Sequence, residues 1–425
     1  MTSAFVKPHV AIIGGGWAGC AAALTLAEAG VTVTLLEASR TLGGRARGVE
    51  LEGQTLDNGQ HILLGAYEQT LHLIERLQAT PGLWRLPLNL NQPPEFSLSC
   101  PRLPAPLHLL AGLLRAQGLG WREKLAAARW AHSLLHGPDA PPAQTVSQLT
   151  CSQPEKLNRL LWHPLCISAL NTPPETASAQ IFRNVIRAAF SGSNRHSDLL
   201  LPRRDLTALF PTPAAARVTK LGGTVRLSCR VTRLDAAEDI ITLNTRDEAI
   251  PCSHVILAVA PQHLADLAAS VPGLQSLAND VASYRYQAIA TAYMQCDPAF
   301  QLAKPLFALA GGPAQFVFDR GQSHGQAGLL AFVASAAENL PADWMDQAEN
   351  QLKHIVRPGP IRWRKAVVEK QATFACVPQI ARPGNRTPHA RIFLAGDYTA
   401  GPYPATLESA TLSGVQSAHA LLEQL

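Results

Sequence analysis

The sequence predicts an α/β fold in which one discontinuous domain, built on a parallel sheet, carries an inserted α+β domain. Three observations support this prediction. Residues 1–37 read as a buried strand, a glycine-rich turn, an alanine-rich helix and a second, β-branched strand. Strand-like segments return near residues 222–261, and the chain ends on a strand, a turn and a helix. Because other material separates these three regions, we expect them to come together as one domain.

The boundaries follow from changes in the pattern along the chain. We expect the first domain to comprise residues 1–75, 205–265 and 385–425, and the inserted domain residues 76–204 and 266–384. From about residue 70 to 204 the pattern is mainly helical and is interrupted by proline clusters. Strand-like runs in the second part of the insertion lie at 288–295, 315–319 and 362–369.

Composition limits the class of protein. With 425 residues, 47% hydrophobic and 16% charged, the chain reads as globular and long enough for two domains. Its net charge of +5 is modest and argues against a nucleic-acid partner, which needs a concentrated basic face. None of the eight cysteines forms a C-x-x-C pair, so we expect no metal site and interpret the thiols as reduced core residues.

The apolar run at residues 10–27 resembles a signal peptide, but four glycines within it would weaken such a helix. No other apolar stretch reaches the roughly 20 residues of a membrane span. We therefore expect a cytoplasmic protein, either free or bound peripherally at the inner face of the cell membrane.

The clearest motif is Gly14-x-Gly16-x-x-Gly19, which follows the first strand and opens the first helix. In this pattern the first glycine permits a tight turn, the second lets a pyrophosphate approach the backbone, and the third lets the helix pack on the strand. Glu37 ends the next strand, 18 residues after Gly19, where an acid can accept hydrogen bonds from a ribose diol. Together these residues predict a Rossmann-type nucleotide-binding domain.

A second glycine block indicates which nucleotide is bound. Gly43-Gly44-Arg45 follows the acidic strand, and the run LDNGQH at residues 56–61 comes after it. A nicotinamide domain needs no such block, whereas a flavoprotein threads a second backbone segment past the phosphates and the isoalloxazine. Arg45 is interpreted as a phosphate ligand, with a surface cation as the alternative. The cofactor predicted is FAD.

The end of the chain completes this pattern. A strand at residues 391–395 leads into Gly396-Asp397, a proline-rich turn and a helix that begins near Thr406. A helix N-terminus beside an aspartate suits the ribityl hydroxyls and the polar edge of a flavin. In the middle of the chain, residues 229–231 are expected in a strand pair that ends in the run 255–261.

These blocks resemble the FAD-dependent amine oxidase and phytoene desaturase superfamily. Within it, LDNGQHILLGAY (56–67), LLLPRRDLTALFP (199–211) and AGDYTAGPYPATLESATLSG (395–414) resemble the hydroxysqualene dehydroxylases of bacterial hopanoid synthesis, a family also known as squalene-associated FAD-dependent desaturases. The resemblance implies that Val231 contacts adenine through its backbone. It also implies reductive removal of an allylic hydroxyl from an apolar C30 isoprenoid alcohol to give squalene. The predicted cofactor-binding residues are Gly14, Gly16, Trp17, Ala18, Gly19, Glu37, Ala38, Gly43, Gly44, Arg45, Asn58, Gly59, Gln60, His61, Val231, Gly396, Asp397, Ala405, Thr406 and Leu407.

Three questions stay open at this point. Loss of an allylic hydroxyl needs a proton donor, and His61 and Tyr403 are the candidates, with a structural role as the alternative for each. No second glycine fingerprint for a nicotinamide nucleotide follows, so an external electron donor or reductase is expected. Residues 101–137 carry five cations against one anion among leucine pairs, which suits either an anionic membrane surface or an ordinary core-covering helix pair.

Two other functions fit the same motifs. One is an FAD-dependent amine oxidase or carotenoid-type desaturase, and the other is a non-catalytic flavin or lipid carrier that kept the fold.

Overall fold

The computed structural model describes residues 8–237 and 240–425. Its first sheet has the strand order β10-β2-β1-β14-β20, and every neighbouring pair is parallel. These strands are β1 (His9–Ile13), β2 (Thr32–Leu36), β10 (Thr224–Arg226), β14 (His254–Leu257) and β20 (Ile392–Leu394). They come from three separate stretches of the chain, as the sequence predicts, and the α/β fold class is confirmed.

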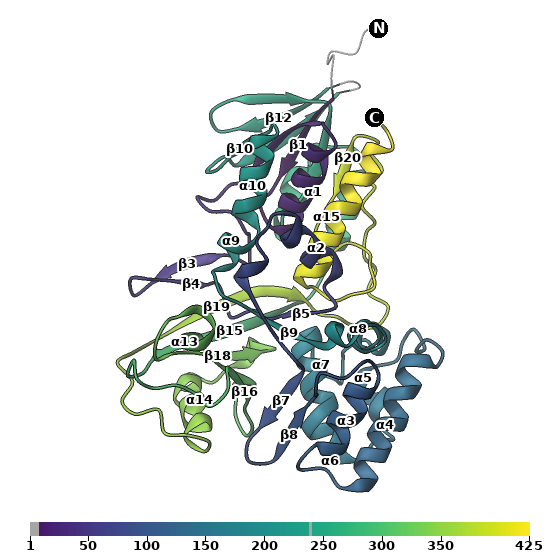
Figure 1. The fold of residues 1–425 in the computed structure, drawn as a ribbon. Coiled ribbons are helices and arrows are strands. Elements are labelled where there is room, and N and C mark those ends of the chain that lie inside the picture. The colour runs from purple at the N-terminus through teal and green to yellow at the C-terminus, as the bar shows by residue number, and fades with distance from the viewer. Residues whose placement is uncertain (1–7, 238–239) are drawn as a thin grey trace.

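Three helices cover this sheet: α1 (Trp17–Glu28), α10 (Pro211–Lys220) and α15 (Leu407–Leu422) (Figure 1). Helix α1 is alanine-rich and buried on nearly all sides, so small side chains let its neighbours approach closely. A Cβ added to Gly414 of α15 would lie 2.2 Å from the Ala18 carbonyl oxygen of α1. The first and the last helix of the chain thus pack directly on each other.

An antiparallel sheet of β11 (Val231–Ala236), β12 (Ile241–Thr245) and β13 (Ala249–Cys252) joins this region. The expectation that residues 229–231 share a strand pair with the run 255–261 is wrong. Strand β11 pairs with β12, whereas β14 pairs with β1 and β20 in the parallel sheet. The connection between β13 and β14 is one residue long, which hides the change of sheet in the sequence.

The second large sheet is antiparallel, with the order β16-β17-β18-β15-β19. Its strands are β15 (Tyr286–Gln295), β16 (Leu306–Ala308), β17 (Phe316–Asp319), β18 (Leu329–Ser335) and β19 (Trp363–Phe374). A group of helices lies beside it (Figure 1): α3 (Leu107–Arg115), α4 (Trp121–His136), α5 (Val146–Thr150), α6 (Glu155–Leu157), α7 (His163–Leu170) and α8 (Ala179–Phe190).

The remaining elements lie around and between these regions. The strands are β3 (Gly48–Leu51), β4 (Gln54–Asp57), β5 (Leu63–Leu64), β6 (Leu83–Leu86), β7 (Asn89–Gln92), β8 (Phe96–Ser99) and β9 (Leu199–Pro202). The helices are α2 (Glu68–Arg76), α9 (Leu206–Leu209), α11 (Leu264–Ala268), α12 (Leu274–Ala282), α13 (Arg320–His324) and α14 (Trp344–Lys353). The predicted domain bounds remain a prediction.

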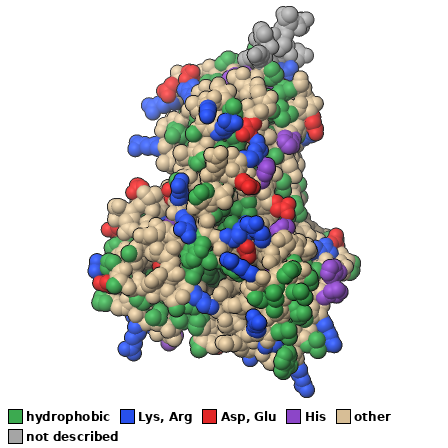
Figure 2. All heavy atoms as spheres, viewed as in Figure 1, with side chains coloured by type: hydrophobic (Ala, Val, Ile, Leu, Met, Phe, Trp, Pro, Cys, Tyr) green, Lys and Arg blue, Asp and Glu red, His purple; other side chains and the backbone are tan. Residues whose placement is uncertain are grey.

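Two features of the molecule are the character of its helices with respect to a bilayer and the distribution of hydrophobic side chains on its surface. Within residues 8–237 and 240–425, no helix combines the length and the apolar character that crossing a bilayer requires. On the face seen in Figure 2, hydrophobic side chains gather at the lower right, where Figure 1 places α3 and α4.

Candidate functional site

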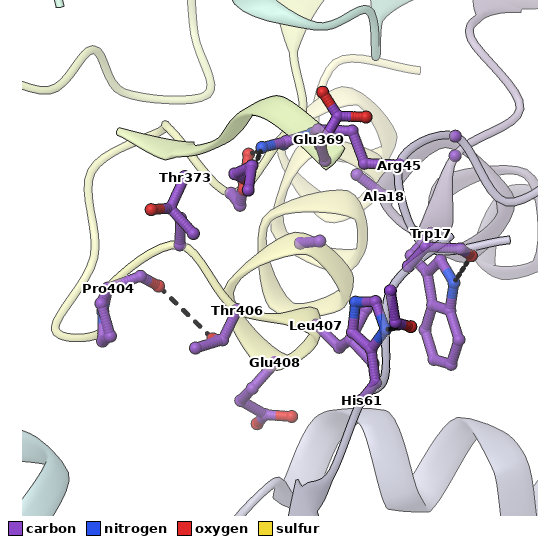
Figure 3. A pocket seen from close by; sticks show the side chains of 18 of the residues that line it. Trp17, Ala18, Arg45, His61, Glu369, Thr373, Pro404, Thr406, Leu407 and Glu408 are labelled. Atoms are coloured by element: carbon purple, nitrogen blue, oxygen red, sulfur yellow. Dashed lines mark hydrogen bonds and ion pairs between the residues drawn. The ribbon is translucent and has the colours of Figure 1, made fainter. Parts of the chain in front are cut away.

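A cavity of about 940 Å³ lies where the parallel sheet, the antiparallel sheet and the helical group meet. Every predicted cofactor-binding residue lines it except Gly19, and so does Tyr403. Figure 3 shows part of this lining, with Arg45 and Glu369 at one end of the view and His61 and Glu408 at the other. The structure therefore brings the widely separated motifs of the sequence around one space.

The glycine loop between β1 and α1 is held by close backbone contacts. Gly14 has a φ of +110°, and a Cβ there would lie 2.4 Å from the Ala258 carbonyl oxygen. A Cβ on Gly19 would lie 1.9 Å from the Gly14 carbonyl oxygen, so this glycine serves packing. Beside Gly16 the nearest atom would be the Gly44 Cα, at 3.9 Å. The open side of Gly16 faces the cavity, where a phosphate could approach.

The second glycine block runs alongside this loop. The Gly43 amide donates to the Gly15 carbonyl at 2.8 Å, and Gly16 and Gly43 form a parallel bridge. Glu37 fixes the same loop, because its two carboxylate oxygens accept from the Gly15 amide at 2.6 Å and the Ser39 amide at 2.8 Å. A carboxylate has about four acceptor positions, so Glu37 can still accept from a ribose.

Arg45 links two blocks that lie far apart in the sequence. Its Nη2 donates to Asp397 Oδ1 at 2.6 Å, and its Nη1 donates to the Ala372 carbonyl at 2.6 Å. Burial alone would lower the pKa of Arg45, but Asp397, with smaller contributions from Glu369 and Tyr286, outweighs this effect and the pKa is raised. The guanidinium is therefore fully charged on the cavity wall. Its contact with a phosphate remains a prediction, since these two partners leave some of its five N–H donors free.

His61 and Tyr403 both line the cavity, but their chemistry differs. The His61 Nδ1 lies 2.8 Å from the Gly59 carbonyl, and burial lowers the pKa of the ring. The imidazole is thus neutral, with its proton on Nδ1 and an acceptor at Nε2. Burial raises the pKa of Tyr403, so its phenol keeps its proton. Both groups are therefore uncharged near neutral pH, and the N–H of His61 is already engaged by the Gly59 carbonyl.

The terminal loop and helix are fixed by two residues that the sequence analysis does not identify. Arg382 donates to the carbonyls of Asp397 at 2.9 Å and Tyr403 at 2.8 Å and stacks on a phenylalanine ring. Glu408, on α15, accepts from the amides of Gln69 and Thr70 at the start of α2, each at 2.9 Å. A carboxylate at that position stabilises a helix N-terminus. Arg382 lies in none of the quoted motifs, and Glu408 lies in the quoted run 395–414, but nothing local in the sequence connects it with Gln69 and Thr70.

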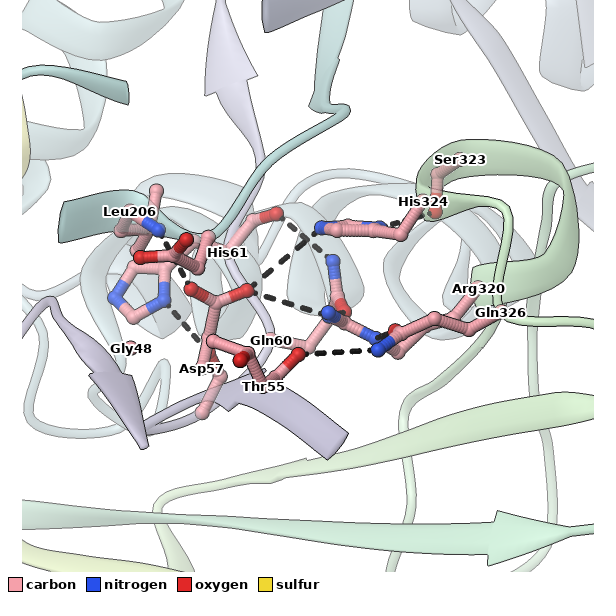
Figure 4. A network of polar contacts seen from close by, with 12 residues as sticks. Gly48, Thr55, Asp57, Gln60, His61, Leu206, Arg320, Ser323, His324 and Gln326 are labelled. Carbon is pink, nitrogen blue, oxygen red and sulfur yellow. Dashed lines mark hydrogen bonds and ion pairs between the residues drawn. The ribbon is translucent and has the colours of Figure 1, made fainter. Parts of the chain in front are cut away.

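Beside the cavity lies a buried polar network (Figure 4). Arg320 Nη1 lies 3.3 Å from Asp57 Oδ2, with the two side chains 0% and 2% exposed. The same Nη1 donates to Gln60 Oε1 at 2.8 Å. His324 Nε2 lies 3.8 Å from Asp57, and burial together with Arg320 lowers the pKa of His324 to about 3. The network ties helix α13 of the antiparallel sheet region to the loop after β4, which lines the cavity.

A large part of the remaining cavity wall is apolar. These residues come from the helical group, the antiparallel sheet and the strands between them: Ile62, Leu64, Leu88, Leu90, Leu165, Val185, Ile186, Ala189, Phe190, Leu199, Leu306, Phe316, Phe318 and Val333. Two further phenols, Tyr67 and Tyr398, also line the cavity. Ile62, Leu64, Tyr67, Leu199 and Tyr398 belong to motifs quoted from the sequence, whereas the other wall residues come from elements that only tertiary folding brings together.

The polar end of the cavity fits a flavin dinucleotide. Gly16 leaves room on its cavity side, the cationic Arg45 lies on the wall, and Glu37 can accept from a ribose. The buried Tyr398 hydroxyl also has no hydrogen-bond partner among the residues that the structure describes. An unpaired buried hydroxyl costs free energy, which a bound polar ligand removes.

Curated relatives extend over nearly the whole chain. It is 29% identical to a hydroxysqualene dehydroxylase from Sinorhizobium fredii, over 98% of this chain and 99% of that protein. It is 28% identical to a hydroxysqualene dehydroxylase from Rhodopseudomonas palustris, over 97% and 98%. A 15-cis-phytoene desaturase from an Oncidium hybrid cultivar is 26% identical, over 98% of this chain and 78% of that protein.

Solved structures agree on the fold. Cyclohexylamine oxidase from Brevibacterium oxydans superposes with a TM-score of 0.65 at 18% identity, covering 98% of this chain and 99% of that one. The family model described as flavin containing amine oxidoreductase matches residues 17–422. This match includes the glycine loop from Trp17 onward and the terminal helix. The chain belongs to the flavin-containing amine oxidoreductases and is an FAD-dependent oxidoreductase.

Proposed function

We propose that this oxidoreductase reductively removes the hydroxyl group of hydroxysqualene to give squalene, a step of hopanoid (triterpenoid) biosynthesis. The observation that carries the proposal is this cavity, which has a polar part that fits FAD and a large apolar and aromatic part beside it. A C30 isoprenoid alcohol offers one hydroxyl and otherwise only hydrocarbon, which matches such a wall. The hydroxysqualene dehydroxylases among the relatives support this substrate.

The reaction sets clear demands on the chain. The allylic C–O bond breaks, the hydroxyl leaves as water after taking a proton, and a hydride replaces it at the carbon skeleton. Reduced FAD, when bound, would supply the hydride. The apolar wall excludes bulk water and orients the hydrocarbon, so the protein must provide the proton from a group on that wall.

Of the two candidate residues, Tyr403 suits the role of proton donor and His61 does not. Burial keeps the Tyr403 phenol protonated, whereas the neutral His61 ring shares its only N–H with the Gly59 carbonyl. We assign His61 to positioning, because that hydrogen bond fixes its ring against the backbone of the loop that lines the cavity. Replacing Tyr403 by phenylalanine is expected to slow flavin reoxidation without releasing FAD.

The electrons must come from outside the chain. Each turnover consumes one reduced flavin, and we propose that a separate reductase or a diffusible reduced carrier restores it. The hydrocarbon substrate is dissolved in a bilayer, and we therefore place the enzyme peripherally at the inner face of the cell membrane.

A desaturase acting on a carotenoid precursor is the second candidate, since phytoene desaturases are also among the relatives. Anaerobic mixing of the reduced protein with each substrate separates the two. A dehydroxylase reoxidises its flavin with hydroxysqualene and releases squalene. A desaturase or amine oxidase leaves the reduced flavin unchanged in that mixture and reoxidises it only with oxygen or a quinone. Absence of reoxidation by hydroxysqualene would overturn the proposed function.

A further inference from the structure

Exposed hydrophobic side chains are concentrated on one small part of the surface. Ten large hydrophobic side chains are exposed in the part of the chain that the structure describes, and six of them lie between residues 103 and 125. We call this set the apolar face: Leu103, Leu107, Leu110, Leu114, Trp121 and Leu125. Trp121 is 73% exposed and Leu107 is 53% exposed. Such a concentration marks an interaction surface.

The apolar face is one continuous surface. Leu107, Leu110 and Leu114 are three and four residues apart on α3, so they form a single stripe. The opposite side of α3 is buried, with a Cβ on Gly112 meeting Cys100 Sγ at 2.7 Å. Lys124 of α4 donates to the Leu114 carbonyl at 2.6 Å and lies 5.3 Å from the centre of the Trp121 ring. One side of α3 and one side of α4 therefore pack against the core, and the opposite side of each helix is exposed to solvent.

Cations surround this face. Arg102, Arg115 and Arg122 are exposed and have no ion-pair partner among residues 8–237 and 240–425. Glu123, the one acid among residues 101–137, uses its carboxylate to cap the start of α4 at the Gly120 amide. Exposed leucine and tryptophan bordered by unpaired arginine match a bilayer surface that carries anionic headgroups.

The apolar face also adjoins the wall of the cavity. The Leu103 carbonyl accepts from Asn194 at 2.8 Å, and His108 lies 3.1 Å from the Ser197 hydroxyl, which lines the cavity. The Leu88 carbonyl, from a second lining residue, accepts from the Cys100 amide at 2.9 Å. Two segments of the cavity wall are thus bonded directly to α3 and the segment preceding it.

We propose that the apolar face is the site by which the protein docks on an anionic lipid bilayer, with α3 and the start of α4 lying in the headgroup region. The face then holds the adjoining cavity wall against the membrane in which an apolar substrate is dissolved. Only this last consequence rests on the proposed function; the docking itself does not.

Sedimentation with vesicles tests the proposal without any substrate. The FAD-loaded protein is mixed with phosphatidylcholine vesicles that contain or lack phosphatidylglycerol. We expect binding to the anionic vesicles and weak binding to the neutral ones. The double variant Leu110→Ser/Leu114→Ser should reduce binding by at least about tenfold. Arg115→Gln/Arg122→Gln should reduce binding to anionic vesicles by about fivefold for each cation removed.

Matched controls come from the rest of the surface. Leu221 and Leu227 are 41% and 44% exposed, close to the 48% and 47% of Leu110 and Leu114. Leu221→Ser/Leu227→Ser and Arg246→Gln/Arg357→Gln should bind vesicles like the wild type. Equal loss in these controls, or unchanged binding by the apolar-face variants, would overturn the proposal. So would a dimer in sedimentation velocity that Leu110→Ser/Leu114→Ser abolishes, because the face would then cover a second copy.

A last measurement separates this proposal from the proposed function. In detergent micelles that deliver hydroxysqualene directly, the Leu110→Ser/Leu114→Ser variant should reoxidise its flavin at the wild-type rate. Vesicle binding without reoxidation in micelles leaves the docking proposal intact and rejects the substrate.

Discussion

At the scale of single residues, two glycines of one motif have different roles. Gly19 has no room for a side chain, because a Cβ would overlap the Gly14 carbonyl oxygen at 1.9 Å. Gly16 has ordinary φ and ψ values of −72° and −178°, and the protein itself leaves space beside it. The absence of a side chain at Gly16 is therefore a requirement of the ligand, whereas at Gly19 it is a requirement of the fold.

This difference is testable with two variants. Gly16→Ala should fold with the stability of the wild-type apoprotein and bind FAD at least about tenfold more weakly, because its methyl group occupies the phosphate approach. Gly19→Ala should lower the free energy of unfolding of the apoprotein by about 1–3 kcal/mol through overpacking. Thermal unfolding of the apoproteins and fluorescence titration with FAD measure the two effects. Full FAD affinity in Gly16→Ala would contradict the placement of the pyrophosphate.

His324 gives a second prediction, on pH. Its folded-state pKa is lowered from 6.5 to about 3 by burial and by Arg320. Between these two values the unfolded chain binds the proton and the folded chain does not. The contribution of His324 to the free energy of unfolding is thus fully present above about pH 6.5. It is lost as the pH falls toward 3, and the free energy of unfolding then changes by up to about 1.4 kcal/mol per pH unit.

His324→Asn should flatten that slope. We expect a smaller loss of unfolding free energy between about pH 6.5 and pH 5 than in the wild type, by up to about 2 kcal/mol. Urea titrations at several pH values measure it. His354→Asn, at an exposed position, serves as the control and should leave the slope unchanged. Identical slopes for His324→Asn and the wild type would show that His324 does not remain neutral in the fold.

At the scale of elements, the buried network joins strand β4, the loop after it and helix α13. Arg320→Met leaves the Asp57 carboxylate without its cationic partner and Gln60 without its donor. Removing one member of a buried ion pair costs about 3–5 kcal/mol, far more than removing one from an exposed pair. We expect that loss in chemical unfolding, together with weaker FAD binding as the loop loses its support.

The comparison variant is Arg362→Met. Arg362 pairs with Asp297 at 3.0 Å, but the two side chains are 57% and 59% exposed. The Arg362→Met substitution should lower the free energy of unfolding by no more than about 1 kcal/mol and leave FAD binding unchanged. If Arg320→Met lowers the free energy of unfolding by as little as Arg362→Met does, Asp57 is protonated in the fold and needs no cationic partner.

Some helices and strands could be predicted from the sequence and others could not. Strands β1, β2 and β15 and helices α1 and α15 are found where periodicity and glycine place them, because their patterns are local. The sequence pattern does not predict strand β18 (Leu329–Ser335), since a run buried on both faces shows no alternation. For α3 and α4 the sequence leaves core packing and membrane contact open, and the structure has a buried side and an exposed apolar side on each.

The site divides in the same way. Its glycines, Glu37 and Asp397 lie in motifs, so they could be found in the sequence. The ion pair between Arg45 and Asp397 could not be predicted, because the two residues are 352 positions apart and only the folded parallel sheet brings them together. The same holds for Arg382, for the contact of Glu408 with α2, and for the part of the apolar wall that lies outside the motifs, where no spacing rule connects Phe316 with Leu88.

At the scale of the whole molecule, the sequence has one glycine fingerprint, and the proposed external electron donor can be tested by the rate at which the flavin is reduced. Under anaerobic conditions NADPH alone should bleach the bound flavin slowly, whereas dithionite or an added reductase system should bleach it fast. Stopped-flow absorbance at the flavin band measures both rates. Reduction by NADPH alone at the rate of turnover would reject the external donor and require a nicotinamide to dock at the flavin.

The packing of α1 on α15 has a further consequence, for the order of events during synthesis. Strand β1 is made first, yet its neighbour β14 and the helix that covers α1 come from much later stretches of the chain. During synthesis, the glycine loop after β1 is therefore made long before β14, β20 and α15, the elements that surround it in the finished fold. We therefore expect FAD to bind only after β20 and α15 have been made, and we expect a chain stalled before β20 to contain no bound flavin.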